Sequence, residues 1–173
     1  YEMVAKMYLT EQEIEQLANF DLSHNIYLSN IRDLWMVMYY TGLRISDARK
    51  LHPQHIQVKN ISLINKKTGK VVVIPISSGL QAIIDRHNGF PPMYSESPIN
   101  REIKVIGRMA GLCEKFTYKE TRGGVMEEQK REKWELLSCH SARRSATTNM
   151  IRNGASHDIA GDMLGMNIRT WAM

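Results

Sequence analysis

The feature that most constrains the fold is an apolar run between residues 28 and 38. Apolar side chains recur there at the spacing of one face of an α-helix: Leu28, Ile31, Leu34, Trp35 and Met38. Gly42 follows the run, and a glycine just past the last periodic residue commonly ends a helix. We therefore expect a buried helix that ends at Gly42 and against which the other elements pack.

Capping residues and helical periods predict further helices, approximately over residues 10–20, 47–51, 78–87, 97–111, 140–152, 156–164 and from 167 onward. Two β-rich runs, 56–64 and 71–76, predict an antiparallel pair. The polar stretch from 116 to 133, with Gly123-Gly124 as its turn, predicts an exposed β-hairpin or a flexible flap. A helix-dominated layout with one small sheet is the α+β fold class.

Two serines are placed to cap helices. Ser46 is predicted to cap the short helix that begins at Asp47. Ser97 is predicted to cap the later helix, because Pro98 follows it and proline is favoured at the first helical position. Isoleucines at 99, 103 and 106 would turn that helix inward.

Composition limits the class of protein. The chain has 173 residues, a length typical of one domain or a large piece of one. Its net charge of +5 and isoelectric point of about 9.3 allow a nucleic-acid partner without requiring one. No run approaches the ~18 apolar residues of a membrane span, so we expect no membrane contact. The two cysteines, Cys113 and Cys139, form no secreted disulfide framework, and this favours a reducing cytoplasm.

The motif with the clearest chemistry is His140-Ser-Ala-Arg143. Residues three apart share one face of a helix, so the imidazole and the guanidinium would point the same way. This pair suits an anionic group such as a phosphate, because the planar guanidinium forms two parallel charge-assisted hydrogen bonds. Arg144 lies beside the pair. The alternative is an exposed basic helix that binds nothing in particular.

A second motif, Thr41-Gly-Leu-Arg-Ile-Ser-Asp47, follows the buried helix. It places Arg44 at a tight corner between two helices. Asp47 comes three residues later and is positioned to hold the guanidinium of Arg44. The alternative is a surface salt bridge worth less than about 1 kcal/mol.

A third motif is the lysine-rich turn between the two β-rich runs. Asn65-Lys-Lys-Thr-Gly-Lys70 contains a glycine suited to a hairpin turn. It would present Lys66, Lys67 and Lys70 at or near the tip of the hairpin. Such lysines also occur simply because they keep a hairpin tip soluble.

His52-Pro-Gln-His55 has a spacing seen in metal sites. A structural zinc site needs further cysteine or histidine ligands nearby, and the sequence shows none. Pro53 also breaks a local helix. We therefore expect no metal site here.

The three motifs, in this order and followed by a glycine-stopped helix and Leu164-Gly165, resemble the catalytic domain of tyrosine recombinases, the phage-integrase family. The chain is most similar to integrases of conjugative transposons and related mobile elements. The resemblance extends from about Leu9 to Met173. It implies a mostly helical DNA breaking–rejoining domain with a small antiparallel β-sheet.

The resemblance also implies an activity. Family members are site-specific recombinases that cleave and rejoin double-stranded DNA through a 3′-phosphotyrosyl intermediate during integration or excision of a mobile element. Such a reaction needs no metal and no cofactor, because the covalent intermediate stores the phosphodiester energy. Side-chain cations must then stabilise the charge that develops on the phosphorane.

Roles follow for individual residues, again as the resemblance implies. Arg44 and Arg143 would bind the non-bridging oxygens, and His140 would contact the phosphate and assist proton transfer. Lys67 would protonate the leaving 5′-oxygen, with Lys66 and Lys70 as less favoured candidates, and Asp47 would support the site. The expected DNA contacts are Arg44, Lys66, Lys67, Lys70, Arg143 and Arg144.

The chain departs from the family at Met166, where histidine or tryptophan is usual. Methionine donates no hydrogen bond, and losing one such donor can reduce a rate by about 10²–10³. A catalytically inactive DNA-binding relative is therefore the alternative function. A protein-interaction domain with a basic surface is a third reading.

The nucleophilic tyrosine would lie near position 175, whereas the last of the seven tyrosines is Tyr118. We therefore expect residues 1–173 to be one catalytic domain, cut before its nucleophile and lacking an N-terminal DNA-clamping domain. Such a fragment would be inactive alone and monomeric in solution. The full-length protein would form a tetramer on DNA in the cytoplasm, associated with the nucleoid.

Overall fold

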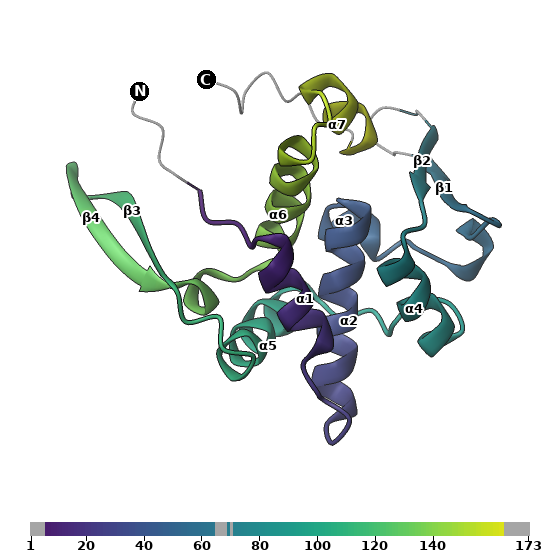
Figure 1. Cartoon of the computed structure of the whole chain (residues 1–173), viewed down its shortest axis with the longest axis horizontal. Coiled ribbons are helices and arrows are strands. Elements are labelled where there is room, and N and C mark those ends of the chain that lie inside the picture. Colours follow the sequence, from purple (N-terminus) through teal and green to yellow (C-terminus); the bar gives the residue numbers. More distant parts are fainter. Residues whose placement is uncertain (1–5, 65–68, 70, 165–173) are drawn as a thin grey trace.

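The central element of the fold is the helix α2 (Ile26–Thr41). The computed structural model describes residues 6–64, 69 and 71–164. In Figure 1, α2 runs through the middle of the molecule, with α1 and α5 on one side, α4 on the other and α6 near its C-terminal end. The expected buried central helix is confirmed.

The described part of the chain contains seven α-helices, two 3₁₀ helices and two antiparallel strand pairs. The other helices are α1 (Glu11–Asn19), α3 (Ile45–Ala48), η1 (Pro53–His55), α4 (Ser78–His87), α5 (Glu96–Met109), η2 (Lys133–Leu136), α6 (Cys139–Arg152) and α7 (His157–Leu164). The strand pairs are β1 (Asn60–Ile64) with β2 (Val71–Pro75), and β3 (Lys115–Arg122) with β4 (Val125–Glu132). This content confirms the α+β class. None of the helices described combines the length and apolar character of a membrane span.

Local signals set the ends of α1 and α2. Thr10 and Glu13 form a capping box, in which the Thr10 hydroxyl accepts from the Glu13 amide and the Glu13 carboxylate accepts from the Thr10 amide. The side chain of Asn25 accepts from the amide of Leu28 at 3.1 Å and caps α2. Gly42 ends α2 in the left-handed conformation, with φ of 64°. The expected end of the helix is confirmed.

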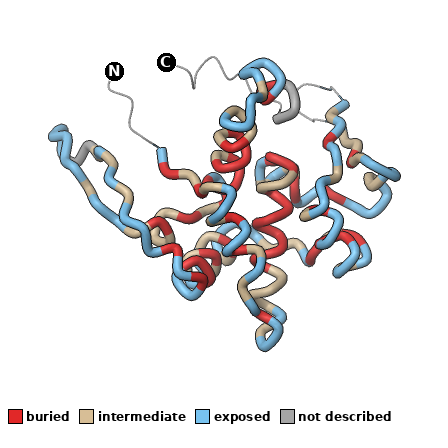
Figure 2. The backbone as a smooth tube through the Cα atoms, viewed as in Figure 1, coloured by how far each residue is buried: buried red, intermediate tan, exposed pale blue. Residues whose placement is uncertain are grey.

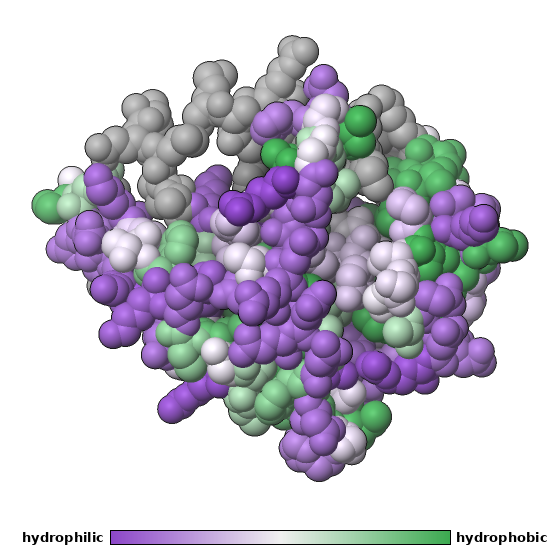
Figure 3. All heavy atoms as spheres, viewed as in Figure 1, coloured by the Kyte–Doolittle hydropathy of each residue, from purple (hydrophilic) through white to green (hydrophobic). Residues whose placement is uncertain are grey.

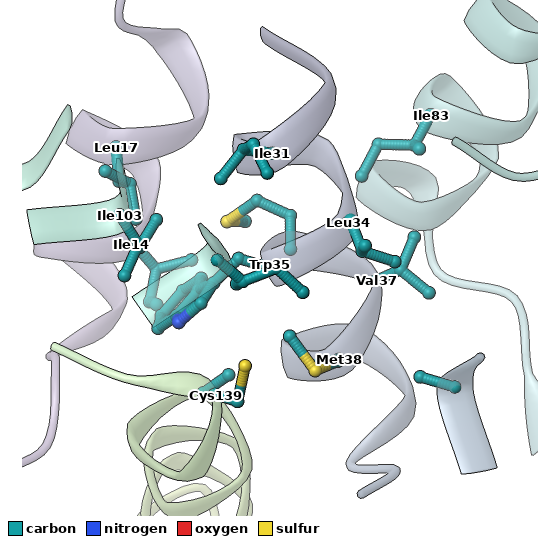
Figure 4. Packing of buried hydrophobic residues seen from close by; sticks show 14 of the residues in the cluster. Ile14, Leu17, Ile31, Leu34, Trp35, Val37, Met38, Ile83, Ile103 and Cys139 are labelled. Carbon is teal, nitrogen blue, oxygen red and sulfur yellow. The ribbon is translucent and has the colours of Figure 1, made fainter. Parts of the chain in front are cut away.

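The core is built around α2. Leu34, Trp35 and Val37 have no exposed surface, and Figure 2 shows burial along most of the helix. Figure 4 shows side chains from α1, α4 and α5 packed against it from different sides. Each large apolar side chain fully buried in this way contributes roughly 1.5–3 kcal/mol. The core therefore fixes α2 as the frame from which the later helices are positioned.

Two predicted caps are wrong. The N-cap of α3 is Arg44, so Ser46 lies inside that single-turn helix. The N-cap of α5 is Ser95, and Ser97 and Pro98 lie within its first turn. The first-turn amides of a helix have no intrahelical acceptor, so proline fits there beyond the first position as well.

The first β-rich run forms a shorter strand than predicted. The amide of Gln57 donates to the carbonyl of Asn60 at 2.7 Å, which makes residues 57–60 a turn. Ile56 is left with an isolated bridge to Ile61. β1 therefore begins only at Asn60.

The β1–β2 pair is amphipathic. Ile61 and Ile74 lie opposite each other and are buried, while Ile64, Val71 and Val73 on the other face are more than half exposed. Figure 3 shows hydrophobic residues on the side of the surface where β1 and β2 lie. One face of the pair thus anchors it to the core.

The second pair, β3–β4, projects from the body in Figure 1, and Figure 2 shows it as largely exposed. Its eight-residue strands pair from Lys115 opposite Glu132 to Arg122 opposite Val125. Gly123 and Gly124 both have positive φ, which the two-residue turns of tight hairpins require. The exposed β-hairpin predicted here is confirmed.

Candidate phosphate-binding site

A hollow of about 250 Å³ lies where three segments meet. These are the corner between α2 and α3, the start of α5 and the first turn of α6. The residues that line it are Arg44, Ile45, Ser46, Glu96, Cys139, His140 and Arg143. The structure therefore brings together three of the predicted site residues from segments far apart in the sequence.

The first turn of α6 holds two of these residues. Ser138 caps the helix, with its side chain accepting from the amide of Ser141 at 3.2 Å, and the Ser141 side chain accepts from the amide of Ser138 at 2.9 Å. This capping box fixes where the helix begins. His140 and Arg143 then fall one turn apart on the same face, as the motif predicts.

Arg44 reaches the hollow from a corner that is held by hydrogen bonds. The hydroxyl of Thr41 donates to the carbonyl of Val37 at 2.7 Å and accepts from the amide of Leu43 at 3.3 Å. Gly42 turns the chain between them. Arg44 follows as an exposed side chain, whereas Arg143, which also lines the hollow, is 4% exposed.

The electrostatics of the hollow favour an anion. Burial, together with the nearby charge of Arg44, lowers the pKa of Arg143 to about 10, and Asp47 acts in the opposite direction. Arg143 is therefore still charged at neutral pH, in a place where its charge is poorly solvated. A phosphate between the two guanidiniums would relieve this.

The pKa of His140 is lowered, as is that of Arg143. Burial lowers its pKa from 6.5, and so do nearby cations, in decreasing order Arg144, Arg143, Lys6 and Arg44. The neutral imidazole is thus the main form at pH 7. A neutral ring can take up a proton when an anion arrives, which suits a role in proton transfer.

Asp47 has a different ion-pair partner from the one expected. Its carboxylate binds the ammonium of Lys50 at 3.2 Å. Its charge also acts on Arg143, whose pKa it raises. The expected support of Arg44 by Asp47 stays a prediction.

Arg144 contacts the segment before α1. Its Nη1 donates to the carbonyl of Met7 at 3.2 Å, and its buried Nε has no hydrogen-bond partner among the described residues. Burial lowers its pKa. Arg144 thus helps to hold this segment against α6, and its DNA contact stays a prediction.

The remaining predicted residues, Lys66, Lys67, Lys70 and Met166, lie outside the described residues. Their roles stay predictions. His52 and His55 are described, and they cap η1: the ring Nδ1 of His55 accepts from the amide of His52 at 2.9 Å. In the described ranges, no group of three or more histidine, cysteine or acidic side chains is arranged to hold a metal ion.

Two residues that line the hollow, Glu96 and Cys139, lie outside the predicted motifs. Glu96 is the first residue of α5. Burial raises the pKa of the Cys139 thiol to about 12, which keeps it protonated and unreactive. An acidic residue in the first turn of a helix is a common signal, but nothing in the sequence places that turn beside His140.

The sequence pattern of the phage integrase family matches residues 7–170. XerA recombinase has a similar structure, with a TM-score of 0.64 and 18% identity over 96% of this chain and 57% of that one. The lambda integrase catalytic core gives a TM-score of 0.62 and 13% identity over 92% of this chain and 91% of that one. Curated protein sequences gave no significant match.

A third similar structure is the integrase of the Tn1549 transposon in complex with transposon right-end DNA. Its TM-score is 0.53, with 15% identity over 98% of this chain and 61% of that one. At these identities the structural likeness establishes the fold. The chain spans 57% of XerA recombinase and 47% of XerH recombinase.

Proposed function

The chain belongs to the phage integrase family, and on that premise we propose that it acts in a site-specific DNA recombinase. The protein would cleave and rejoin DNA strands through a 3′-phosphotyrosyl intermediate during integration or excision of a mobile element. The observation that carries the proposal is the meeting of Arg44, His140 and Arg143 around one hollow of about 250 Å³.

In the proposed mechanism, the scissile phosphate enters the hollow between the two guanidiniums. Arg44 and Arg143 bind its non-bridging oxygens with charge-assisted hydrogen bonds. They stabilise the charge of the phosphorane without a metal, because both cations already line the hollow and the buried cation of Arg143 is poorly solvated. His140 contacts the same phosphate and assists proton transfer. Lys67 protonates the leaving 5′-oxygen.

The same proposal extends to the DNA partner and the oligomeric state of the protein. XerH recombinase has been solved bound to its difH substrate, and lambda integrase as a tetramer bound to a Holliday junction. We propose that this chain supplies the catalytic domain of a longer protein that binds double-stranded DNA in the cytoplasm. That protein would be tetrameric on DNA, whereas residues 1–173 alone would be monomeric and inactive.

A second candidate is a catalytically inactive DNA-binding relative. The observation that favours it is Met166, which cannot donate the hydrogen bond that histidine or tryptophan gives at this position in the family. Such a protein would keep the phosphate hollow and lose the chemistry.

A suicide DNA substrate tests the proposal. The full-length protein should form a covalent protein–DNA adduct that resists denaturation, and DNA affinity should fall linearly on a log–log plot against salt. Tight salt-dependent binding without any adduct would favour the inactive relative. Binding that does not depend on salt would contradict both functions.

The lowered pKa of His140 gives a pH prediction. A bound phosphate stabilises the imidazolium, so the pKa of His140 is higher in the complex than in the free protein. Affinity for DNA should therefore rise as the pH falls from about 7.5 to about 5.5, by at most tenfold per pH unit for one proton. Fluorescence anisotropy of a labelled duplex at constant ionic strength measures this.

A matched control separates His140 from other histidines. His140→Gln should remove most of the pH dependence, whereas His24→Gln should leave it intact, because His24 is exposed near the start of α2, away from the hollow. Equal pH dependence in the parent protein and in His140→Gln would contradict the assignment of His140 to the phosphate.

A further inference from the structure

We propose that Asn100 on α5 is a positioning residue of the phosphate hollow, because its side-chain carbonyl holds the first amide of α6 and so fixes where His140 and Arg143 face Arg44. This inference rests on the proposed function and adds a residue to it. No sequence motif pointed to Asn100.

The contact is a hydrogen bond between residues 39 positions apart. The Oδ1 of Asn100 accepts from the backbone amide of Cys139 at 2.7 Å. Cys139 is the first residue of α6, and the first amides of a helix have no acceptor within the helix. Asn100, on the neighbouring helix α5, therefore supplies the hydrogen-bond acceptor that the first amide of α6 lacks within its own helix.

The same peptide group is held from its other side. The indole Nε1 of Trp35 donates to the carbonyl of Ser138 at 2.8 Å. That carbonyl and the amide of Cys139 belong to one planar peptide unit, and they point in opposite directions. In Figure 4, Trp35 on α2 is drawn with its ring nitrogen toward the start of α6.

One peptide plane is thus fixed between α2 and α5. A helix whose first peptide is held at both ends has little freedom to rotate about its axis or slide along it. His140 is the next residue after this peptide, and Arg143 follows one turn later. Their positions relative to Arg44 therefore depend on the two tethers.

A second residue of α5, Glu96, lies at the hollow. Glu96 lines the hollow and precedes Asn100 by four residues, so both lie on the same face of α5.

Removing Asn100 should not unfold α6, because the Ser138–Ser141 capping box stays intact. The expected loss is therefore in placement rather than in folding.

Asn100→Ala in the full-length protein tests the inference. We expect the rate of strand cleavage to fall roughly 10- to 100-fold, as for small displacements of catalytic groups. The dissociation constant for DNA should change much less. A loosened first turn should also move the pKa of His140 up toward its ordinary value, as measured by NMR titration of the imidazole.

Asn25→Ala is the matched control. It removes the same kind of side-chain carbonyl from a helix N-terminus, on α2, but away from the hollow. It should cost similar stability and leave both the cleavage rate and the His140 titration unchanged. Identical His140 titrations in Asn100→Ala and Asn25→Ala would overturn the inference.

Asn100→Asp provides a second variant, since it keeps an acceptor oxygen at the same position. The amide of Cys139 should stay protected from hydrogen exchange in Asn100→Asp and lose protection in Asn100→Ala. Loss of protection in both variants would contradict the acceptor role. The NMR measurements need no DNA, so they test Asn100 even where the parent protein forms no adduct and the proposed function fails.

Discussion

Asp33→Ala is expected to destabilise the protein by about 3–5 kcal/mol, the cost of removing one partner from a buried ion pair. Asp33 on α2 is 1% exposed. Its carboxylate binds Arg32 at 3.1 Å, Arg86 at 2.7 Å and His87 at 2.8 Å. It is thus the anionic centre of a cluster that ties α4 to α2.

The large effect comes from what the substitution leaves behind. Arg32 is 6% exposed, and its Nη1 donates to the carbonyl of Phe20 at 2.6 Å. Without the carboxylate of Asp33, a buried guanidinium keeps its charge and loses its counter-ion. Because total stabilities are about 5–15 kcal/mol, the loss is a large fraction of what holds the domain together.

Urea unfolding followed by tryptophan fluorescence measures the effect, and the melting temperature should fall by roughly 10 °C. Asp85→Ala is the control, because Asp85 lies on α4 beside Arg86 but is exposed, and its carboxylate accepts a hydrogen bond from the side-chain amide of Gln81 at 2.7 Å. Its effect should stay within about 0.5 kcal/mol. Equal losses for both variants would show that burial of Asp33 does not matter.

The Asp33 cluster shows where sequence reasoning stops. Helical periods identified α2, α4 and α6 because each period is a local property of the chain. Ion pairs between α2 and α4 join residues more than 50 positions apart. Nothing in a single sequence marks which buried aspartate meets which arginine, so these contacts emerged only from the structure.

The residues at the hollow likewise fall into those that the sequence indicated and those that only the structure revealed. Arg44, His140 and Arg143 belong to short motifs whose spacing carries their chemistry, and the structure brings them together. Asn100 and the indole of Trp35 act through backbone groups, which leave no pattern in the side chains. The charged side chains that line the hollow from these motifs were therefore predictable, whereas the contacts that hold the start of α6 were not.

Arg143→Met is expected to separate stability from function. Losing hydrogen bonds to a charged group costs about 1.5–3 kcal/mol, which is roughly a 10- to 150-fold loss of DNA affinity. In the full-length protein the cleavage rate should fall by a further 10²–10³ or so, because the interaction strengthens as charge develops on the phosphorane.

The melting temperature should not fall in the same variant. The pKa of Arg143 is lowered to about 10, which means that the folded protein holds this proton less tightly than the unfolded chain does. At neutral pH, below both values, the charge of Arg143 therefore opposes folding. Methionine has a similar length and removes that charge from a site where Arg44 repels it.

Arg152→Met is the control for charge. Arg152 lies in the last turn of α6, where its Nη1 donates to the hydroxyl of Tyr8 at 3.0 Å, and it is exposed. Both variants change the net charge equally on the same helix, so any difference in DNA affinity reflects position. A lower melting temperature with unchanged affinity in Arg143→Met would mean that Arg143 serves the fold. Weaker DNA binding with an undiminished melting temperature would mean that the domain keeps a poorly solvated cation, at a cost in stability, because that cation binds the phosphate.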